Sequence, residues 1–171
     1  HAGAPIEFRN IRVRALTETD KAEMDAKFEP LRTHTASGLR LGKGVNISHW
    51  LSQRGDSTLN PRIFFTEADV IFIASQGFDH IRLPIEESVM WNPDGSPNET
   101  SFATLDTAIG WIEDAGMAVV VDLHIINAHH FNASNDEGKN TLFTDPASQE
   151  HLADLWRELS SRLDKWGNDF L

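Results

Sequence analysis

Three short runs of apolar and β-branched residues divide the chain at regular intervals. They cover Gly44–Ser48, Phe78–Leu83 and Met117–Leu123. The third run is nearly all apolar, which is typical of a strand whose two faces are both covered. We therefore predict three buried strands, and we expect Pro84 to end the second one because proline cannot donate to a sheet.

Between these runs, apolar residues recur with helical spacing. The pattern predicts helices over Thr66–Gln76 and Ser101–Ala115, and a third that begins at Pro146. Thr66 and Asp145 are suited to cap the first and third helices, and proline is favoured at a first helical position. A glycine follows each predicted helix, at Gly77, Gly116 and Gly167.

The order of these elements predicts an α/β fold built from βα units. Strands that alternate with helices form a parallel sheet with right-handed crossovers. Each helix returns to the next strand through a short turn, whereas each strand reaches its helix through a long segment. The long loops therefore lie beyond the carboxyl ends of the strands, where parallel α/β proteins place their ligand sites. Residues 169–171 resemble the start of a fourth strand.

Residues 1–43 do not follow this alternation of strands and helices, and we expect them to form an N-terminal cap that closes the bottom of the fold. Ile6–Val13 alternates like an edge strand, and Thr17–Phe28 has the composition of a short charged helix. The βα units then occupy residues 44–171. The chain begins at His1 rather than Met, and both removal of a secretory leader and deliberate trimming of the sequence fit this terminus.

The composition of the chain limits the classes of ligand and surface that the protein could bind. The 171 residues carry a formal net charge of −11, which disfavours duplex nucleic acid and anionic lipid because like charges repel. No stretch reaches the roughly 18 apolar residues of a membrane span. Cysteine is absent, which excludes disulfides, thiolate metal sites and a cysteine nucleophile. A neutral, polyhydroxylated or apolar ligand stays open, and we predict no cofactor.

Side chains that could bind sugar follow all three predicted strands. Aromatic rings stack on the C–H faces of sugars, and polar groups fix the hydroxyls. The candidates are His49 and Trp50 after the first strand, Arg82, Glu86 and Trp91 at and after the second, and His124, Asn127, His129 and His130 after the third.

Arg82 and His124 have competing interpretations. Arg82 lies within an apolar strand, where a charge requires a partner. It could form a structural ion pair with Asp79 or Asp122, or it could point inward and hold a catalytic carboxylate ionised. His124 could be a satisfied core residue, a site residue, or a metal ligand together with Asp122, His129 and His130. The spacing of these histidines matches no strong metal motif, so we predict no metal.

The tryptophans and the loop acids also have structural interpretations. Trp50 and Trp91 could be apolar plugs beneath the loops. Trp156 and Trp166 lie on the apolar stripe of the third helix, and we expect them in the core. Glu86 and Glu87 could be a solvated pair, which is the usual state of acids outside regular elements.

Several of these motifs together resemble glycoside hydrolase family 5, the cellulase-like family. They are the segments 44–53 (GVNISHWLSQ), 78–84 (FDHIRLP) and 121–124 (VDLH). The segments 108–111 (AIGW) and 127–132 (NAHHFN) resemble a bacterial branch. The resemblance extends in unbroken order over residues 40–171.

The resemblance implies a TIM (β/α)8 barrel, of which this chain supplies about (βα)3 and the start of strand four. It also implies hydrolysis of β-linked polysaccharide with retention, by two glutamates about 5 Å apart. Arg82 matches the family arginine that supports the nucleophile, and His124 matches the histidine that lines the cleft. The implied glycone subsites involve His49, Trp50, Glu86, Trp91, Asn127, His129 and His130.

The catalytic glutamates of the family follow strands four and seven, so we expect them outside these residues. A second polypeptide segment is then required to complete the barrel, and residues 1–171 alone should not hydrolyse glycan. The favoured substrate is β-1,4-linked glucan, and mannan, xylan and xyloglucan stay open, as does a non-catalytic half-barrel that binds glycan. A bacterial cellulase-like enzyme is expected to be secreted or periplasmic.

Overall fold

The computed structural model describes residues 17–19, 22, 41–54, 60–130 and 140–166. The chain divides into two units, residues 1–33 and 34–171. In the first unit, Glu18, Thr19 and Ala22 are helical, within the helix predicted over Thr17–Phe28. The strand predicted over Ile6–Val13 and the fourth strand predicted at residues 169–171 lie outside the described residues.

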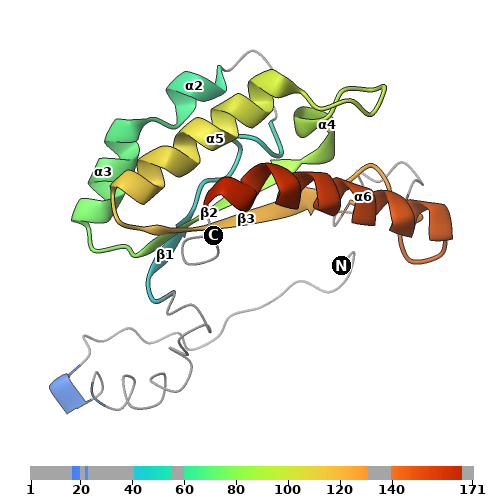
Figure 1. Cartoon of the computed structure of the whole chain (residues 1–171). Helices are drawn as coiled ribbons and strands as arrows, with labels where there is room; N and C mark the ends of the chain where they lie inside the picture. The colour runs from blue at the N-terminus through green and yellow to red at the C-terminus, as the bar shows by residue number, and fades with distance from the viewer. Residues whose placement is uncertain (1–16, 20–21, 23–40, 55–59, 131–139, 167–171) are drawn as a thin grey trace. The chain divides into compact units, whose positions relative to one another are not determined.

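The second unit is built on a parallel sheet of the predicted order (Figure 1). Its strands are β1 (Gly44–Asn46), β2 (His80–Glu86) and β3 (Ala118–Ile125). They pair in the order β1-β2-β3, with Asn46 opposite Arg82 in the first ladder. The prediction of three parallel strands joined by helical crossovers is confirmed.

The carboxyl ends of all three strands differ from the prediction, and β2 and β3 begin at His80 and Ala118 rather than at Phe78 and Met117. β1 ends at Asn46 rather than Ser48, and β3 continues to Ile125, so His124 lies inside a strand rather than after it. The prediction that Pro84 ends β2 is wrong, because β2 runs through Pro84 to Glu86. The Glu86 N–H donates to the Leu51 carbonyl at 3.0 Å, so the Pro84 nitrogen also faces the β1 side. β1 ends before it reaches this position, so the N–H that proline lacks would have had no partner in the β1–β2 ladder.

The three main helices occur where they were predicted, except that the second begins at Glu99 rather than Ser101 because Asn98 caps it. They are α3 (Glu67–Ser75), α5 (Glu99–Asp114) and α6 (Pro146–Leu163), and the last continues as the 3-10 turn η2 (Asp164–Trp166). Thr66 caps α3 in a capping box with Asp69, and the Asp145 side chain accepts from the Ala147 N–H at 3.1 Å. Two one-turn helices, α2 (Pro61–Phe64) and α4 (Glu87–Met90), lie in the loops after β1 and β2.

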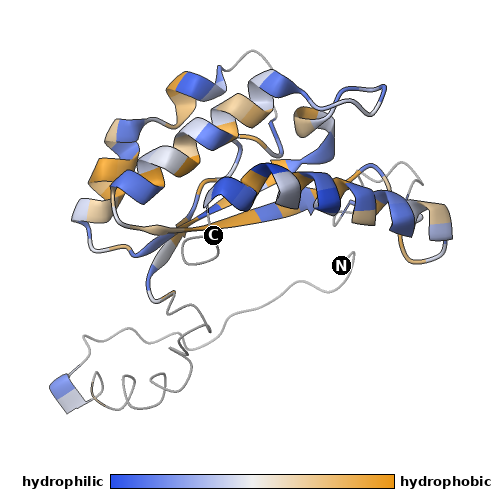
Figure 2. Ribbon diagram, viewed as in Figure 1, coloured by the Kyte–Doolittle hydropathy of each residue, from blue (hydrophilic) through white to orange (hydrophobic). Residues whose placement is uncertain are grey.

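The core lies on one side of the sheet, between the strands and the helices (Figure 1). Alternate residues of β2 and β3 enter it and meet the apolar stripes of α5 and α6. Figure 2 shows that β3 is mostly hydrophobic along its length, whereas α6 carries many hydrophilic residues. The central contacts come from Ile81, Leu83, Ile85, Val119, Leu105, Ile109, Ile112 and Leu159, all with exposed fractions of 1% or less.

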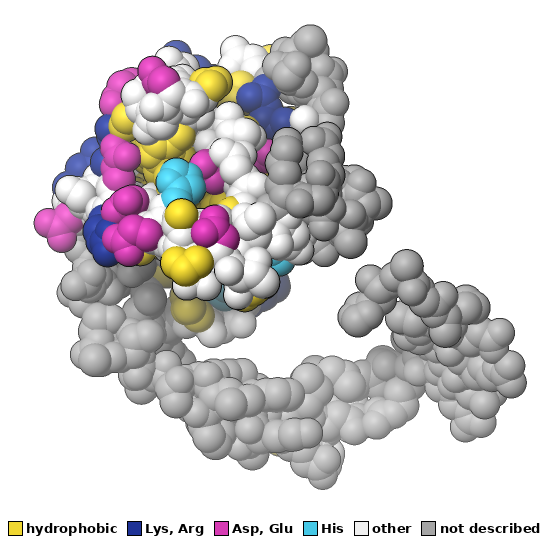
Figure 3. Space-filling model, turned by 90° about the vertical axis from the view of Figure 1, so that its right-hand side faces the viewer, with side chains coloured by type: hydrophobic (Ala, Val, Ile, Leu, Met, Phe, Trp, Pro, Cys, Tyr) yellow, Lys and Arg dark blue, Asp and Glu magenta, His cyan; other side chains and the backbone are white. Residues whose placement is uncertain are grey.

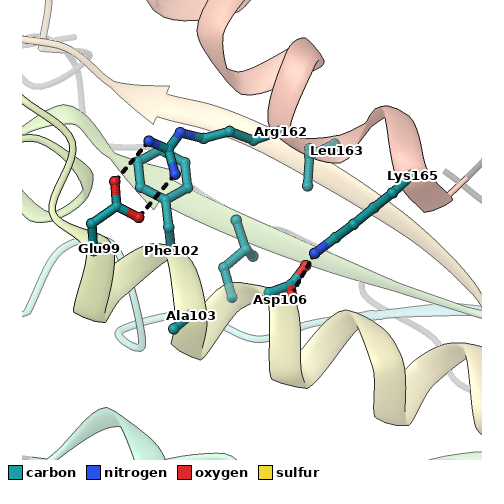
Figure 4. Close-up of a pocket in the computed structure, with 8 residues that line it drawn as sticks. Glu99, Phe102, Ala103, Asp106, Arg162, Leu163 and Lys165 are labelled. Carbon is teal, nitrogen blue, oxygen red and sulfur yellow. Dashed lines mark hydrogen bonds and ion pairs between the residues drawn. The ribbon is translucent and has the colours of Figure 1, made fainter.

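α5 and α6 are also joined by charge pairs (Figure 4). Arg162 donates to both carboxylate oxygens of Glu99, at 2.8 and 3.1 Å, and Lys165 donates to Asp106 at 2.7 Å. These pairs line a pocket of about 270 Å³ that the largely buried ring of Phe102 also borders. Since each of the four charged side chains has an ionic partner, the pocket fits a helix seam better than a ligand site.

Some large apolar side chains lie outside the core. The prediction that Trp156 is a core residue is wrong, since 43% of it is exposed on α6. Trp166 is half-buried, packs against the core and donates from its indole nitrogen to Asp106 at 3.0 Å. On α3, Ile71 and Phe72 are 59% and 63% exposed. Both α3 and α6 therefore present apolar faces that nothing in the described residues covers.

Asp79 anchors the turn that leads into β1. Its carboxylate accepts from the Gly42 and Lys43 N–H groups at 3.0 Å, and its Oδ1 lies 2.7 Å from His80 Nδ1. Partial burial alone raises the pKa of Asp79, but the hydrogen bonds from His80, Lys43 and Gly42 outweigh it, so the pKa falls below its usual 3.8.

We expect Asp79→Asn to lower the free energy of unfolding by about 1 kcal/mol at neutral pH, a small effect because the carboxylate is 43% exposed. A depressed folded pKa means that this stabilisation is complete above the unfolded pKa and is lost as pH falls through the folded value. Urea unfolding of both proteins from pH 7 to pH 2.5 measures it. Asp114→Asn, at an exposed position on α5, is the control. A difference in the free energy of unfolding between wild type and Asp79→Asn that persists at low pH contradicts this account.

Candidate active site

Four polar side chains meet on the side of the sheet that faces away from the helices. Arg82 Nη1 donates to Asn46 Oδ1, and Arg82 Nη2 donates to Asp122 Oδ2. The same Nη2 lies 3.2 Å from His124 Nδ1, and that ring nitrogen lies 3.0 Å from Asp122 Oδ2. One guanidinium therefore links all three strands.

Strand register explains why these residues meet. Asn46 is opposite Arg82 in the β1–β2 ladder, and Arg82 is opposite Val120 in the β2–β3 ladder. Side chains two residues apart share a face of a strand, which places Asp122 and His124 on the same side as Arg82. The sequence left Asp79 and Asp122 open as partners of Arg82, and the structure shows Asp122.

The cluster is open to a ligand on this side. The side chains of Arg82, Asp122 and His124 are 37%, 30% and 27% exposed. A partly exposed guanidinium fixed by an amide and a carboxylate is a pre-oriented hydrogen-bond donor, and the neighbouring imidazole adds a second polar group. The arrangement can orient hydroxyl groups or hold an additional carboxylate, which is the chemistry that a sugar cleft requires.

The loop after β1 contains two residues in the left-handed backbone region. His49 has a φ of 59° and Gln53 a φ of 53°, a conformation that non-glycine residues adopt mainly at constrained positions. His49 is exposed. The Gln53 N–H donates to Glu86 Oε2 at 2.9 Å, and the Ser88 hydroxyl donates to Glu86 Oε1 at 2.6 Å. Glu86 therefore ties this loop to the end of β2.

Both candidate tryptophans of these loops are buried. Trp50 is 1% exposed, stacks edge-on with Phe65 and donates to the Pro61 carbonyl at 2.9 Å. Trp91 is 4% exposed, meets Phe102 edge-on and donates to Glu158 at 3.0 Å. These contacts favour the interpretation as plugs beneath the loops over stacking on a sugar ring.

The acids after β2 are not a solvated pair. Glu87 is 5% exposed, which corrects that alternative. Its Oε2 accepts from the Asn127 N–H at 2.7 Å, and its Oε1 accepts from the Asn127 side-chain amide at 2.7 Å. His151 Nε2 on α6 lies 2.7 Å from Oε1. Asn127 thus contacts Glu87 rather than the Arg82 cluster.

The remaining candidates lie in the loop after β3. His129 Nδ1 is 2.5 Å from Asn140 Oδ1, and its ring meets Phe143 edge-on. His130 is half-buried at the last described position before residue 140. Figure 3 shows one end of the molecule, where acidic side chains and a histidine surround apolar ones. The structure thus brings Arg82 and His124 together and distributes the other candidates over three loops.

Asn46 in the Arg82 cluster was not among the sequence candidates, and Glu87 was considered beside Glu86 without its burial beneath Asn127 being predicted. Asn46 could have been found, because a polar residue inside a predicted strand shares a face with any residue in register with it. The burial of Glu87 had no signal, since its partners lie 40 and 64 residues away.

The described residues show neither a cluster of metal ligands nor a helix that could span a membrane. Ranges 41–54, 60–130 and 140–166 bring together no group of three or more His, Asp or Glu side chains that could hold a metal ion. In the same part of the chain, no helix has both the length and the hydropathy of a membrane span.

Comparison with known proteins places this geometry in a family. Residues 42–168 match the model of "Cellulase (glycosyl hydrolase family 5)". Endoglucanase C of Acetivibrio thermocellus is 33% identical over 122 residues, which are 70% of this chain and 35% of that protein. Cellodextrinase A of Ruminococcus flavefaciens is 33% identical over 74% of this chain and 36% of its own length. The chain thus spans about a third of the length of these relatives.

Solved structures show the same fold. A crystal structure of a glycoside hydrolase superposes with a TM-score of 0.62 at 19% identity, over 75% of this chain and 38% of that one. Thermotoga maritima Cel5A with cellobiose gives a TM-score of 0.57 at 21% identity, again over 75% and 38%. The sheet is therefore part of a TIM barrel, and its helix-free side is the barrel interior. The chain belongs to the cellulase family, glycosyl hydrolase family 5.

Proposed function

We propose that this chain is the N-terminal part of a retaining glycoside hydrolase that cleaves β-1,4-linked glucan. The observation that carries the proposal is the cluster of Asn46, Arg82, Asp122 and His124 on the interior side of the strands. The similarity to an endoglucanase and a cellodextrinase supports glucan as the substrate.

In the proposed mechanism, two glutamates contributed by the rest of the barrel perform the chemistry. One protonates the leaving oxygen and the other attacks the anomeric carbon, after which water hydrolyses the glycosyl-enzyme intermediate. Arg82 supports the nucleophilic carboxylate through its charge and hydrogen bonds. His124 lines the cleft beside the sugar at the point of cleavage, and no cofactor is required.

The roles of the loop residues follow from their surroundings. His49, His129 and His130 have polar groups on the loops at the carboxyl ends of the strands, so we propose them as contacts to sugar hydroxyls. Glu86 organises the loop after β1 through Gln53. The buried Trp50 and Trp91 support the loops from beneath, and Asn127 acts through Glu87.

Completion of the barrel is a necessary part of the proposal. We use the term completed barrel for this chain together with the polypeptide that supplies the remaining strands, whether it continues this chain or is a second one. In a TIM barrel, each strand pairs on both sides, and neighbouring helices cover one another. The exposed Ile71 and Phe72 on α3 and Trp156 on α6 are suited to those additional contacts.

The substrate is tested by hydrolysis with the completed barrel. We expect reducing sugar to be released from carboxymethyl cellulose at least tenfold faster than from β-1,3-glucan, xylan or mannan. Mannan is the runner-up, because Thermotoga maritima Cel5A has been solved with mannotriose. Preferential hydrolysis of mannan overturns the glucan assignment, and binding without hydrolysis of any of these polymers indicates a non-catalytic glycan-binding barrel.

We further propose that the protein acts outside the cytoplasm, secreted or in the periplasm. Polymeric glucan does not cross a bacterial membrane, so its hydrolysis has to occur where the polymer is. The similarity to bacterial endoglucanase and cellodextrinase supports this location.

A further inference from the structure

Glu87 is a charged side chain in an unusual position. It begins the one-turn helix α4 directly after β2, yet it is 5% exposed. Burial of a carboxylate costs several kcal/mol unless hydrogen bonds and opposite charge compensate for it. A carboxylate that is retained at such a cost, next to a predicted cleft, calls for a specific role.

Both oxygens of Glu87 are used, and by segments far away in the chain. Asn127 donates twice, from its backbone N–H to Oε2 and from its side-chain amide to Oε1, each at 2.7 Å. His151 on α6 lies 2.7 Å from Oε1. One carboxylate thus connects the end of β2, the loop after β3 and the first turns of α6.

Packing holds part of this corner of the molecule, because Ile126 is 6% exposed and Ala128 packs against the core. A cavity of about 440 Å³ borders Glu87, Trp91, Asn127 and His151. Asn127 itself is exposed. On either side of it, Ile126 and His129 bond to each other, and the Ala128 carbonyl accepts from the Thr141 and Leu142 N–H groups at 2.9 and 3.0 Å. The hydrogen bonds between Asn127 and Glu87 therefore join this loop to the end of β2, in addition to the apolar packing of Ile126.

We infer that Glu87 is a positioning residue that fixes the loop of residues 126–130 at the rim of the sugar cleft. This inference rests on the proposed function and deepens it, because the loop carries His129 and His130. Asn127 is the residue through which Glu87 acts. Loss of the carboxylate frees the loop and moves its histidines away from the sugar, while Arg82 and His124 on the strands stay in place.

The test compares Glu87→Gln with Glu113→Gln in the completed barrel. Both remove one negative charge, but Glu113 is exposed on α5. In Glu87→Gln an amide NH2 replaces one acceptor oxygen, so a donor of Asn127 or His151 loses its partner. We expect KM for a soluble cello-oligosaccharide to rise about tenfold with kcat changed less than twofold, and no change in Glu113→Gln.

A second variant and a second readout keep the inference testable if Glu87→Gln folds poorly. Asn127→Ala removes the side-chain hydrogen bond by changing its other partner and should raise KM similarly. In the double variant, KM should rise no further than in the single variant with the larger effect. Hydrogen exchange should quicken in residues 126–130 of both variants but not in β2 or α5. This second readout does not depend on activity, so it tests the loop even if the completed barrel cleaves no glycan.

Two outcomes overturn the inference. The first is equal KM and equal loop exchange in Glu87→Gln and Glu113→Gln. The second is a fall in stability spread over the whole domain without a change in KM, which indicates that Glu87 is merely a structural residue.

Discussion

Replacing Arg82 with alanine is expected to lower kcat of the completed barrel by about 100-fold or more. The guanidinium is bonded to Asn46 on β1 and to Asp122 on β3, and it lies 3.2 Å from His124. Its loss removes the guanidinium from the partly buried Asp122 and removes the charge that we propose supports the nucleophile. KM should change less than kcat, because the loops that bind distant sugars are unaffected.

Two further substitutions separate this role from a general effect on charge. Arg82→Lys keeps the positive charge, but a single ammonium group cannot bond to both Asn46 and Asp122 as the planar guanidinium does. The kcat of Arg82→Lys should therefore stay at least tenfold below that of wild type. Arg157 on α6 is 63% exposed and pairs with Glu150 and Asp154, so Arg157→Ala should keep full activity. Equal kcat values for Arg82→Ala and Arg157→Ala would refute the assignment of Arg82.

The order of the elements could be predicted because local signals agree with the fold. Thr66 and Asp145 cap their helices as predicted, and Gly77 and Gly116 adopt φ values of 75° and 70° after theirs. These features depend on residues close in sequence. The parallel sheet then follows from the alternation of strands and helices.

Burial depends on distant residues, and there the sequence was less informative. Burial was a possible outcome for both Trp50, beneath a loop, and Trp156, on the apolar stripe of a helix. In the structure, Trp50 is 1% exposed and Trp156 is 43% exposed. Pro84 lies inside β2 because β1 ends early, which residues near the proline do not reveal. Asp122 and Asp79 were equal candidates as partners of Arg82 until the register between β2 and β3 was known.

The second large effect concerns completion of the barrel. We expect the 171-residue chain alone to hydrolyse no β-glucan, because the proposed acid/base and nucleophile belong to strands that it does not supply. Its Arg82 cluster orients groups but includes no pair of glutamates suited to acid and nucleophile among the described residues. The exposed apolar faces on α3 and α6 should also make the isolated chain self-associate.

The most direct measurement is release of reducing sugar from a soluble β-1,4-glucan by the 171-residue chain and by the completed barrel, at equal concentration. The account predicts no release above buffer from the isolated chain and clear turnover from the completed barrel, which Arg82→Ala lowers about 100-fold. Turnover by the isolated chain at a rate similar to that of the completed barrel would contradict it.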